Sequence, residues 1–221
     1  MKYLIIIINK IKMTNEFEKK INSFMLNDLT NKSEPIILEF GVRKGISTKN
    51  FIKVCEQKNG HLYSIDVDDC SEISNSSKWT FIKSRDDDFE NLKNKLPEQF
   101  DLIFLDSFHN AEHVCKIFYH YYSKLKKGGS FYFDDISWLP YLKNRERDNF
   151  NCEINNLETF EKLVEIFSTN QKNMDLYFSF VGSGMAKIIK LSNQKLVKQK
   201  KIKSRKFSIK NFVRKFYNYF L

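Results

Sequence analysis

The sequence predicts an α/β fold in which helices cover both faces of a mostly parallel sheet. Between residues 36 and 135, five short apolar runs alternate with amphipathic, helix-like segments, an order typical of parallel strands that are buried on both faces. Two later apolar runs flank the turn Gly-Ser-Gly, which predicts a closing antiparallel hairpin. A chain of 221 residues therefore suits one α/β domain with tails.

The individual elements follow from the spacing of apolar residues. Strands are expected at residues 36–40, 61–67, 80–84, 100–106 and 130–135. Helices are expected at residues 47–57, 88–96, 111–127 and 157–167. A long irregular connection over residues 136–156 precedes the last of these helices, and the hairpin follows it at 176–191.

Three units are expected along the chain. Residues 1–33 are an N-terminal helical extension that packs on the core through a helix over 14–33, and residues 34–191 form the α/β domain. Residues 192–221 form a basic, amphipathic tail. Of the 37 Lys and Arg residues, 12 lie from residue 176 onward, where there is no Asp or Glu. The domain itself is nearly neutral, which argues against a face that tracks a nucleic-acid backbone.

The cellular setting is expected to be the cytoplasm. The four cysteines show no CxxC pairing, which favours free thiols in a reducing compartment. The apolar run Tyr3 to Ile8 is far shorter than the roughly 20 residues that span a bilayer, and no signal cleavage site follows it. Translation starts at Met1 or at Met13; both alternatives stay open.

The first chemical motif is EFGVRKGIST, Glu39 to Thr48, where the first strand passes into a helix. Gly41 permits a sharp turn, and Gly45 permits close approach to the helix N-terminus, where anions and nucleotides bind. A purely structural turn would use the same residues.

This motif resembles motif I of class I methyltransferases that use S-adenosylmethionine. It resembles most the E-x-G-x-x-x-G-x-S/T form of the methyltransferase 24 and macrocin O-methyltransferase-like families, over residues 35–137. Arg43 and Lys44 depart from the glycine-rich consensus of many methyltransferases. The resemblance implies a Rossmann-like, seven-stranded methyltransferase sheet. It also implies that the methionine and ribose parts of S-adenosylmethionine lie near Glu39, Gly41, Gly45 and Ser47.

Two further acids are candidates for donor binding. Asp66 ends the second strand, where a carboxylate can accept both ribose hydroxyls; the alternative is that it caps the next turn. Asp86 follows the third strand, and the resemblance implies that it contacts the adenine edge. The alternative for Asp86 is a cap on the helix over 88–96.

Three carboxylates end the fourth and fifth strands and are candidates for a metal site. Asp106, Asp134 and Asp135 are expected at one sheet edge, where open α/β sheets bind ligands, and their oxygens suit Mg²⁺. Catechol-type and macrocin-type O-methyltransferases are similar at these positions. The alternative is that Asp106 alone is functional and the acidic pair caps the loop.

His109 follows Asp106 by three residues and is the candidate general base for a substrate hydroxyl, with a helix-capping role as the alternative. His109, Glu112 and His113 also match the H-x-x-E-H pattern of a zinc peptidase family. Their place after a buried strand of a nucleotide-type sheet argues against that chemistry.

The connection after the fifth strand is expected to form a lid or substrate wall, with a plain surface loop as the alternative. Trp138 and Tyr141 could flank a sugar or aromatic ring, and Arg145 and Arg147 could bind an anion.

In the tail, a basic run precedes a segment of helical periodicity. The apolar residues that fall on one face of this expected helix are Ile209, Phe212, Val213, Phe216 and Phe220. Such a helix suits an anionic membrane surface, which would make the protein peripheral, or a partner protein. Docking on its own domain or on a second subunit, and nucleic-acid binding, stay open.

The sequence thus predicts S-adenosylmethionine-dependent, metal-assisted O-methylation of a small hydroxylated acceptor such as a sugar or glycan precursor. One alternative is an RNA methyltransferase that uses the basic tail, although the Asn/Asp-Pro-Pro-Tyr/Phe motif is absent. Another is a non-catalytic nucleotide-binding scaffold, against which the retained acids argue. Nicotinamide chemistry is disfavoured because G-x-G-x-x-G is missing.

Overall fold

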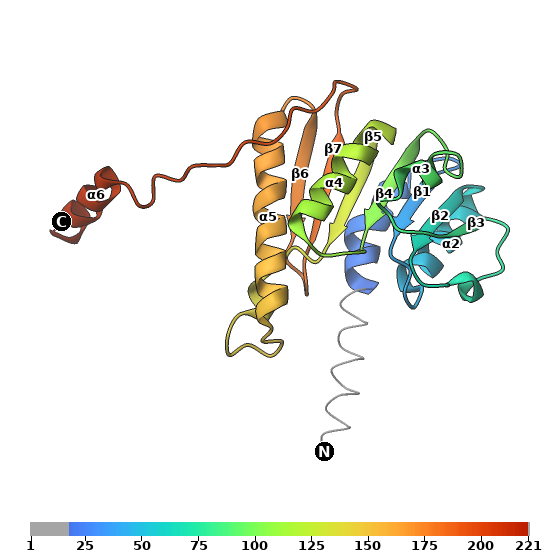
Figure 1. Ribbon diagram of the computed structural model, residues 1–221, viewed down its shortest axis with the longest axis horizontal. Helices are drawn as coiled ribbons and strands as arrows, with labels where there is room; N and C mark the ends of the chain where they lie inside the picture. The colour runs from blue at the N-terminus through green and yellow to red at the C-terminus, as the bar shows by residue number, and fades with distance from the viewer. Residues whose placement is uncertain (1–17, 221) are drawn as a thin grey trace, which may run out of the picture.

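The sheet has seven strands in the order β3-β2-β1-β4-β5-β7-β6 (Figure 1). This computed structural model describes residues 18–220. The strands are β1 (Ile36–Phe40), β2 (His61–Asp66), β3 (Trp79–Lys83), β4 (Phe100–Leu105), β5 (Leu125–Asp134), β6 (Met174–Ser179) and β7 (Met185–Lys190). The first five strands pair in parallel, and β7 lies antiparallel between β5 and β6. The predicted mostly parallel sheet with a C-terminal antiparallel hairpin is confirmed.

Helices cover both faces, as the two-sided burial of the strands requires. They are α2 (Ile46–Lys58), α3 (Phe89–Lys93), α4 (Ala111–Tyr121) and α5 (Phe150–Asn170), whereas α6 (Ile209–Phe220) lies away from the sheet (Figure 1). The shorter turns are η1 (Ile21–Met25), η2 (Leu26–Leu29), η3 (Ser71–Ile73), η4 (Tyr122–Lys124) and η5 (Leu139–Tyr141). One core cluster joins α3, α4 and α5 to the sheet, and a second joins α2, η1 and η2 to the opposite face.

The N-terminal segment is part of the second core cluster. Ile21, Met25 and Leu29 are fully buried against the sheet and α2, because their spacing puts them on one side of a helical segment. Residues 18–20 are α-helical, as predicted, but the segment then continues as a π-helical turn and a 3-10 turn instead of a regular helix to residue 33. The predicted helix also covers residues 14–17, which lie outside the described residues, as do both candidate start methionines.

The largest difference from the predicted elements concerns α5. It begins at Phe150 instead of residue 157, because the Asn149 side chain accepts a hydrogen bond from Cys152 N (3.0 Å) and caps the helix. The irregular connection after β5 is therefore shorter than predicted. The helix starts at the carboxyl edge of the parallel strands, the lower edge of the sheet in Figure 1.

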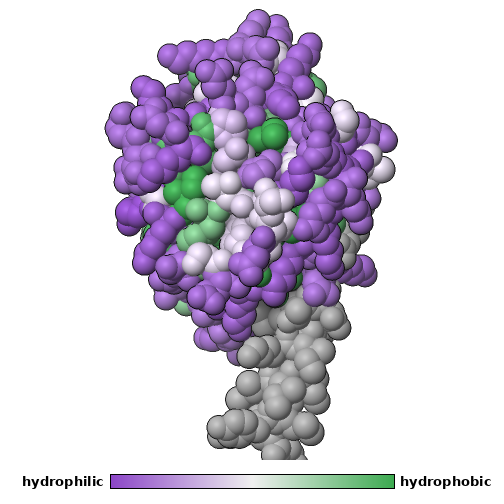
Figure 2. All heavy atoms as spheres, turned by 90° about the vertical axis from the view of Figure 1, so that its right-hand side faces the viewer, coloured by the Kyte–Doolittle hydropathy of each residue, from purple (hydrophilic) through white to green (hydrophobic). Residues whose placement is uncertain are grey.

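Viewed from the β3 side, the surface is mainly hydrophilic around a smaller hydrophobic area (Figure 2). None of the helices in the described part of the chain is long and apolar enough to cross a membrane. All four cysteines are free thiols.

Candidate functional site

The turn between β1 and α2 lies directly against the end of β4. Gly41 has φ +91°, and a Cβ on it would lie 1.9 Å from the backbone oxygen of Asp106. The peptide N–H of Asp106 donates to Phe40 O (2.8 Å), and that of Gly41 donates to Ile65 O (2.9 Å). Only glycine fits here, because a Cβ would overlap the backbone at the end of the neighbouring strand. The turn and Asp106 are thereby held in register.

Glu39 lies beneath this turn and has no exposed surface. Its carboxylate accepts hydrogen bonds from Ser47 Oγ (2.5 Å), Thr48 Oγ1 (2.8 Å) and Ser64 Oγ (2.7 Å). Burial raises the pKa of Glu39 to about 7, although the three hydroxyls oppose that rise. The carboxylate ties β1 to the first turn of α2 and to β2. Glu39 and Ser47 thus shape the predicted donor site from below, and their direct contact with a donor stays a prediction.

Gly45 ends the turn as the N-cap of α2, with φ +69°. A Cβ there would lie 2.4 Å from Ile73 Cγ2, so the residue also lets η3 pack over the helix start. This arrangement leaves the α2 N-terminus beside the strand tips, where the predicted donor site lies.

Asp66 lies at the tip of β2 and is only partly buried. Its Oδ2 accepts from Val42 N (2.7 Å) and Arg43 N (3.0 Å), and its Oδ1 accepts from Asp68 N (3.0 Å). Burial alone would raise the pKa of Asp66, but these backbone donors outweigh it and hold the pKa below its ordinary value. The side chain is therefore an ionised acceptor at the edge of the turn.

The three acidic residues after β3, Asp86 to Asp88, have different partners. Asp88 caps α3 by accepting from Asn91 N, and Asp87 pairs with Arg85 (2.8 Å) and Lys116. Asp86 is nearly buried and accepts from Ser107 Oγ (2.5 Å), while the Nε2 atom of His113 lies 2.9 Å from it. The predicted helix cap thus falls to Asp88. The sequence analysis considered His113 only in the H-x-x-E-H pattern and did not consider Ser107, although both residues follow Asp106 closely in the chain.

Asp106, Asp134 and Asp135 lie where β4 and β5 end, near enough for the charges of the acidic pair to act on Asp106. His109 Nε2 lies 3.5 Å from Asp106 Oδ1 and 3.4 Å from Asp135 Oδ2. Burial and the neighbouring carboxylates of Asp134 and Asp135 raise the pKa of Asp106 well above its ordinary value. The three side chains of Asp106, His109 and Asp135 are each between one quarter and about one third exposed. A histidine flanked by two acids therefore opens to solvent at the carboxyl edge.

Asp134 points to a different partner. It forms a buried ion pair with Lys20 from the N-terminal segment, and Lys20 also donates to Ser183 Oγ (2.9 Å). Burial raises the pKa of Asp134, and the Lys20 charge partly offsets the rise. Sequence reasoning missed Lys20; its signal is a lysine directly before Ile21 on an otherwise apolar helical face.

The carboxylates have the chemistry of a Mg²⁺ site but not yet its geometry. Within residues 18–220, no group of three or more His, Cys, Asp or Glu side chains is arranged to hold a metal ion. The H-x-x-E-H residues also diverge, since His113 faces Asp86 while Glu112 pairs with Lys162 (3.0 Å). Oxygen donors and surplus negative charge nevertheless fit a hard divalent cation.

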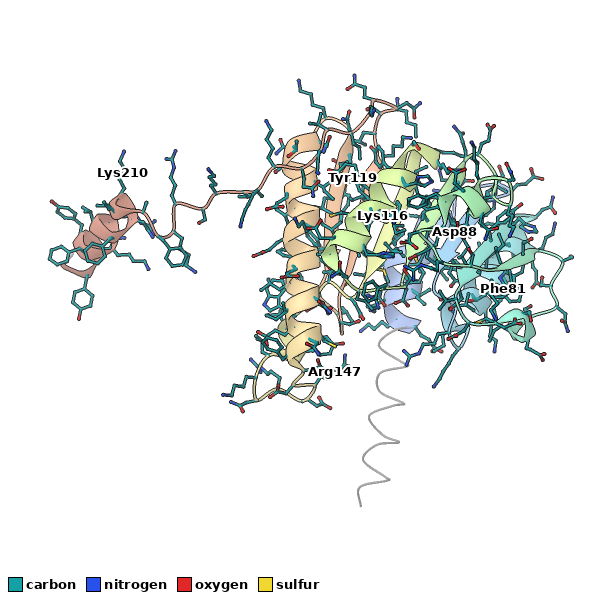
Figure 3. All side chains as sticks on the ribbon, viewed as in Figure 1. Phe81, Asp88, Lys116, Tyr119, Arg147 and Lys210 are labelled. Carbon is teal, nitrogen blue, oxygen red and sulfur yellow. The ribbon has the colours of Figure 1, made fainter. Side chains whose placement is uncertain are left out.

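The connection after β5 borders the acids on one side. Burial first, and then the charge of Asp135, raise the pKa of Tyr141 to about 12, and Arg147 forms a hydrogen bond with this tyrosine. Arg147 is labelled in Figure 3, below α5. Trp138 instead packs on Phe160, with ring centroids 5.1 Å apart. Of the residues predicted to line the substrate, Tyr141 and Arg147 lie beside the acids, whereas Arg145 is exposed.

Residues 38–136 match the model of a protein family described as a methyltransferase domain, the methyltransferase 24 family. The match runs from the middle of β1 past the acidic pair after β5. This part of the chain, just under half of it, is thus similar to a methyltransferase domain. The predicted resemblance to this family is confirmed. A sequence search of curated proteins finds no match.

Solved structures share the fold of the methyltransferase domain. MycE from the mycinamycin biosynthetic pathway, in complex with Mg, SAH and mycinamycin VI, is 22% identical with a TM-score of 0.56 over 77% of this chain and 48% of that chain. A Staphylococcus aureus protein described as a caffeoyl-CoA O-methyltransferase is 19% identical, with a TM-score of 0.56 over 80% of this chain and 82% of that chain. The plantazolicin methyltransferase BpumL, bound to SAH, is 15% identical with a TM-score of 0.57 over 82% of this chain and 86% of that chain. The protein thus spans about half the length of MycE.

Proposed function

We propose that the protein transfers the methyl group of S-adenosylmethionine to a hydroxyl of a small acceptor, of the sugar or glycan-precursor class. The observation that carries the proposal is the position of His109 between Asp106 and Asp135, beside the turn that Gly41 packs onto β4. A base and a donor-binding turn then share one edge of the sheet. One of the similar structures is an O-methyltransferase by name, which supports a hydroxyl acceptor, and MycE is bound to mycinamycin VI, which supports a small acceptor.

The donor is expected to lie over the turn at residues 41–45. Asp66 accepts two backbone N–H groups at Oδ2 and one at Oδ1, so one of about four acceptor sites is left, at Oδ1. It can therefore hold the turn and accept one ribose hydroxyl at the same time. The predicted role of Asp86 at the adenine edge, shared with the Ser107 hydroxyl, completes the donor site.

In the transfer step, His109 Nε2 accepts the proton of the acceptor hydroxyl. The oxygen attacks the methyl carbon, the new C–O bond forms, and the C–S bond breaks to leave a neutral thioether. The adjacent carboxylates of Asp106 and Asp135 stabilise the imidazolium that results.

A divalent cation is part of the proposal, since MycE structures contain Mg. Asp106, Asp134 and Asp135 would hold it, and it would orient the acceptor hydroxyl and lower its pKa. Lys20 supplies positive charge to the same carboxylates, so Lys20 must share Asp134 with the metal or release it.

Donor binding is tested by calorimetric titration with S-adenosylhomocysteine. Asp66→Ala should weaken binding roughly 10-fold or more, because a charged hydrogen bond to the ribose is lost. Asp69→Ala is the matched control, as Asp69 is exposed and hydrogen-bonds only to its neighbour Ser71 among the described contacts. Unchanged affinity in Asp66→Ala would refute the ribose contact.

The base is tested by methyl transfer from labelled donor to a panel of sugars and phenols. His109→Gln should slow transfer about 100-fold or more while leaving donor affinity intact. His61→Gln is the control, because His61 is the first residue of β2 and lies at the opposite edge of the sheet. Full activity of His109→Gln on every accepted substrate would remove His109 from the mechanism.

The metal is tested by thermal unfolding with and without excess Mg²⁺. Mg²⁺ should raise the midpoint of Lys20→Met more than that of the wild type, since the competing ammonium is gone. In the double variant Lys20→Met with Asp106→Asn, Mg²⁺ should no longer raise the unfolding midpoint. An equal rise in all three chains would show that Mg²⁺ does not bind these carboxylates.

A further inference from the structure

We propose that α6 attaches the protein to the surface of an anionic phospholipid membrane. The helix stands apart from the methyltransferase domain, at the end of an extended segment (Figure 1). The inference rests on the chemistry of the tail alone and does not depend on methyl transfer.

The tail is divided into a docked part and an exposed part. Val197 N and O form hydrogen bonds with the Asn170 side chain (both 2.9 Å), and Gln199 N donates to the Tyr119 hydroxyl (2.9 Å). Lys200 N donates to Thr169 Oγ1 (3.3 Å). Residues 196–199 and α4 line a pocket of about 400 Å³. Docking on its own domain thus accounts for the tail only as far as about residue 202.

Beyond that point the apolar side chains lie in solvent. Phe207 is 92% exposed, Ile209 83% and Phe212 72%, and Val213 is exposed as well. At 3.6 residues per turn, Ile209, Phe212 and Val213 fall on one face of α6. A 12-residue helix is marginal by itself in water, so burial of this face is what would stabilise it.

Basic residues border the apolar face. Lys210, Arg214 and Lys215 lie at other positions around α6, and Lys210 extends away from the helix in Figure 3. The segment over residues 195–206 adds seven more Lys or Arg residues, and no acidic residue follows residue 175. Positive charge around an exposed aromatic face complements anionic headgroups over an acyl interface.

The two features together favour lipid over the other occupants. A nucleic acid would use the basic run but would leave the Ile209 and Phe212 face exposed to water. A protein groove would bury that face, yet ten basic residues around it, all from residue 195 onward, match a surface of spread negative charge better than a single groove.

The test is flotation of the full chain with vesicles of phosphatidylcholine alone or with added phosphatidylglycerol. We expect at least tenfold stronger binding to the anionic vesicles, a loss of binding at high salt, and a gain of helix signal in circular dichroism on binding. Ile209→Asn with Phe212→Asn should reduce the binding at least tenfold. Asn211→Ser, on the polar side of α6, is the matched control, and an unchanged thermal unfolding midpoint shows that every variant is folded.

Several results would overturn the proposal. Binding to anionic vesicles that persists in the double variant would show simple charge attraction by the basic run. RNA binding that outcompetes vesicles would assign the tail to nucleic acid. A dimer by size-exclusion chromatography that the double variant abolishes, without vesicle binding in the wild type, would assign the face to a second copy of the chain.

Discussion

Glu39 should make the stability of the protein fall as pH rises from 5 to 8. Its pKa is raised from an ordinary value of 4.5 to about 7, so the folded state binds more protons than the unfolded state between those two values. Linkage then requires that unfolding free energy decreases with rising pH across this window. With about 1.4 kcal/mol for each pKa unit, the loss between pH 5 and pH 8 is about 2.5 kcal/mol.

The substitution Glu39→Gln removes this titration while keeping the shape of the side chain. The amide oxygen still accepts a hydroxyl, and the serine and threonine hydroxyls can rotate to accept from its NH₂ group. Urea unfolding at pH 5 and pH 8 gives the free energy of each chain. From pH 5 to pH 8, the free energy of unfolding of the variant should rise by about 2.5 kcal/mol relative to that of the wild type.

The matched control is Glu98→Gln, because Glu98 is exposed at the surface. A constant free-energy difference between wild type and Glu39→Gln from pH 5 to pH 8 would refute the argument. It would mean that the three hydroxyls compensate fully for the burial of the carboxylate.

Two further predictions concern packing and charge at the same edge. Gly41→Ala should destabilise the domain by at least about 2 kcal/mol in urea unfolding, because the new Cβ would overlap the backbone of β4. Gly128→Ala, with φ +76° but nothing within 4 Å, should cost only about 1 kcal/mol; equal losses would show that backbone strain, not contact, is the cause. Lys20→Met should cost about 3 kcal/mol by leaving Asp134 buried without its cation, whereas Lys126→Met, in a more exposed pair, should cost less than about 1 kcal/mol. Similar losses for the two lysines would contradict the role given to the buried pair.

The fold and the strand tips could be predicted because their signals are local. Each apolar run forms a strand, the central strands β1 and β4 are buried on both faces, and each tip acid ends such a run or directly follows it. Asp66, Asp106 and Asp134 therefore meet at one edge once the strands are parallel. The Gly-Ser-Gly turn likewise specifies the hairpin without long-range information.

The partners of those acids could not be predicted, because they come from distant parts of the chain. Lys20 lies 114 residues before Asp134 in the chain, and His113, which contacts Asp86 in the loop after β3, lies in α4. The predicted start of α5 was wrong for a related reason. The Asn149 cap starts α5 early within a polar stretch that has no apolar periodicity to mark it.

The balance of negative and positive charge at the carboxyl edge bears on how the proposed site would release its product. The charges of Glu39, Asp134 and Asp135 all act on Asp106, and the Lys20 charge opposes them at both Asp106 and Asp134. A site with surplus carboxylates attracts a cationic sulfonium more strongly than the neutral thioether that remains after transfer. In the proposed site these acids would therefore hold the product less tightly than the donor. Lys20 limits that surplus, so the N-terminal segment that carries it belongs to the electrostatics of the site as well as to the core.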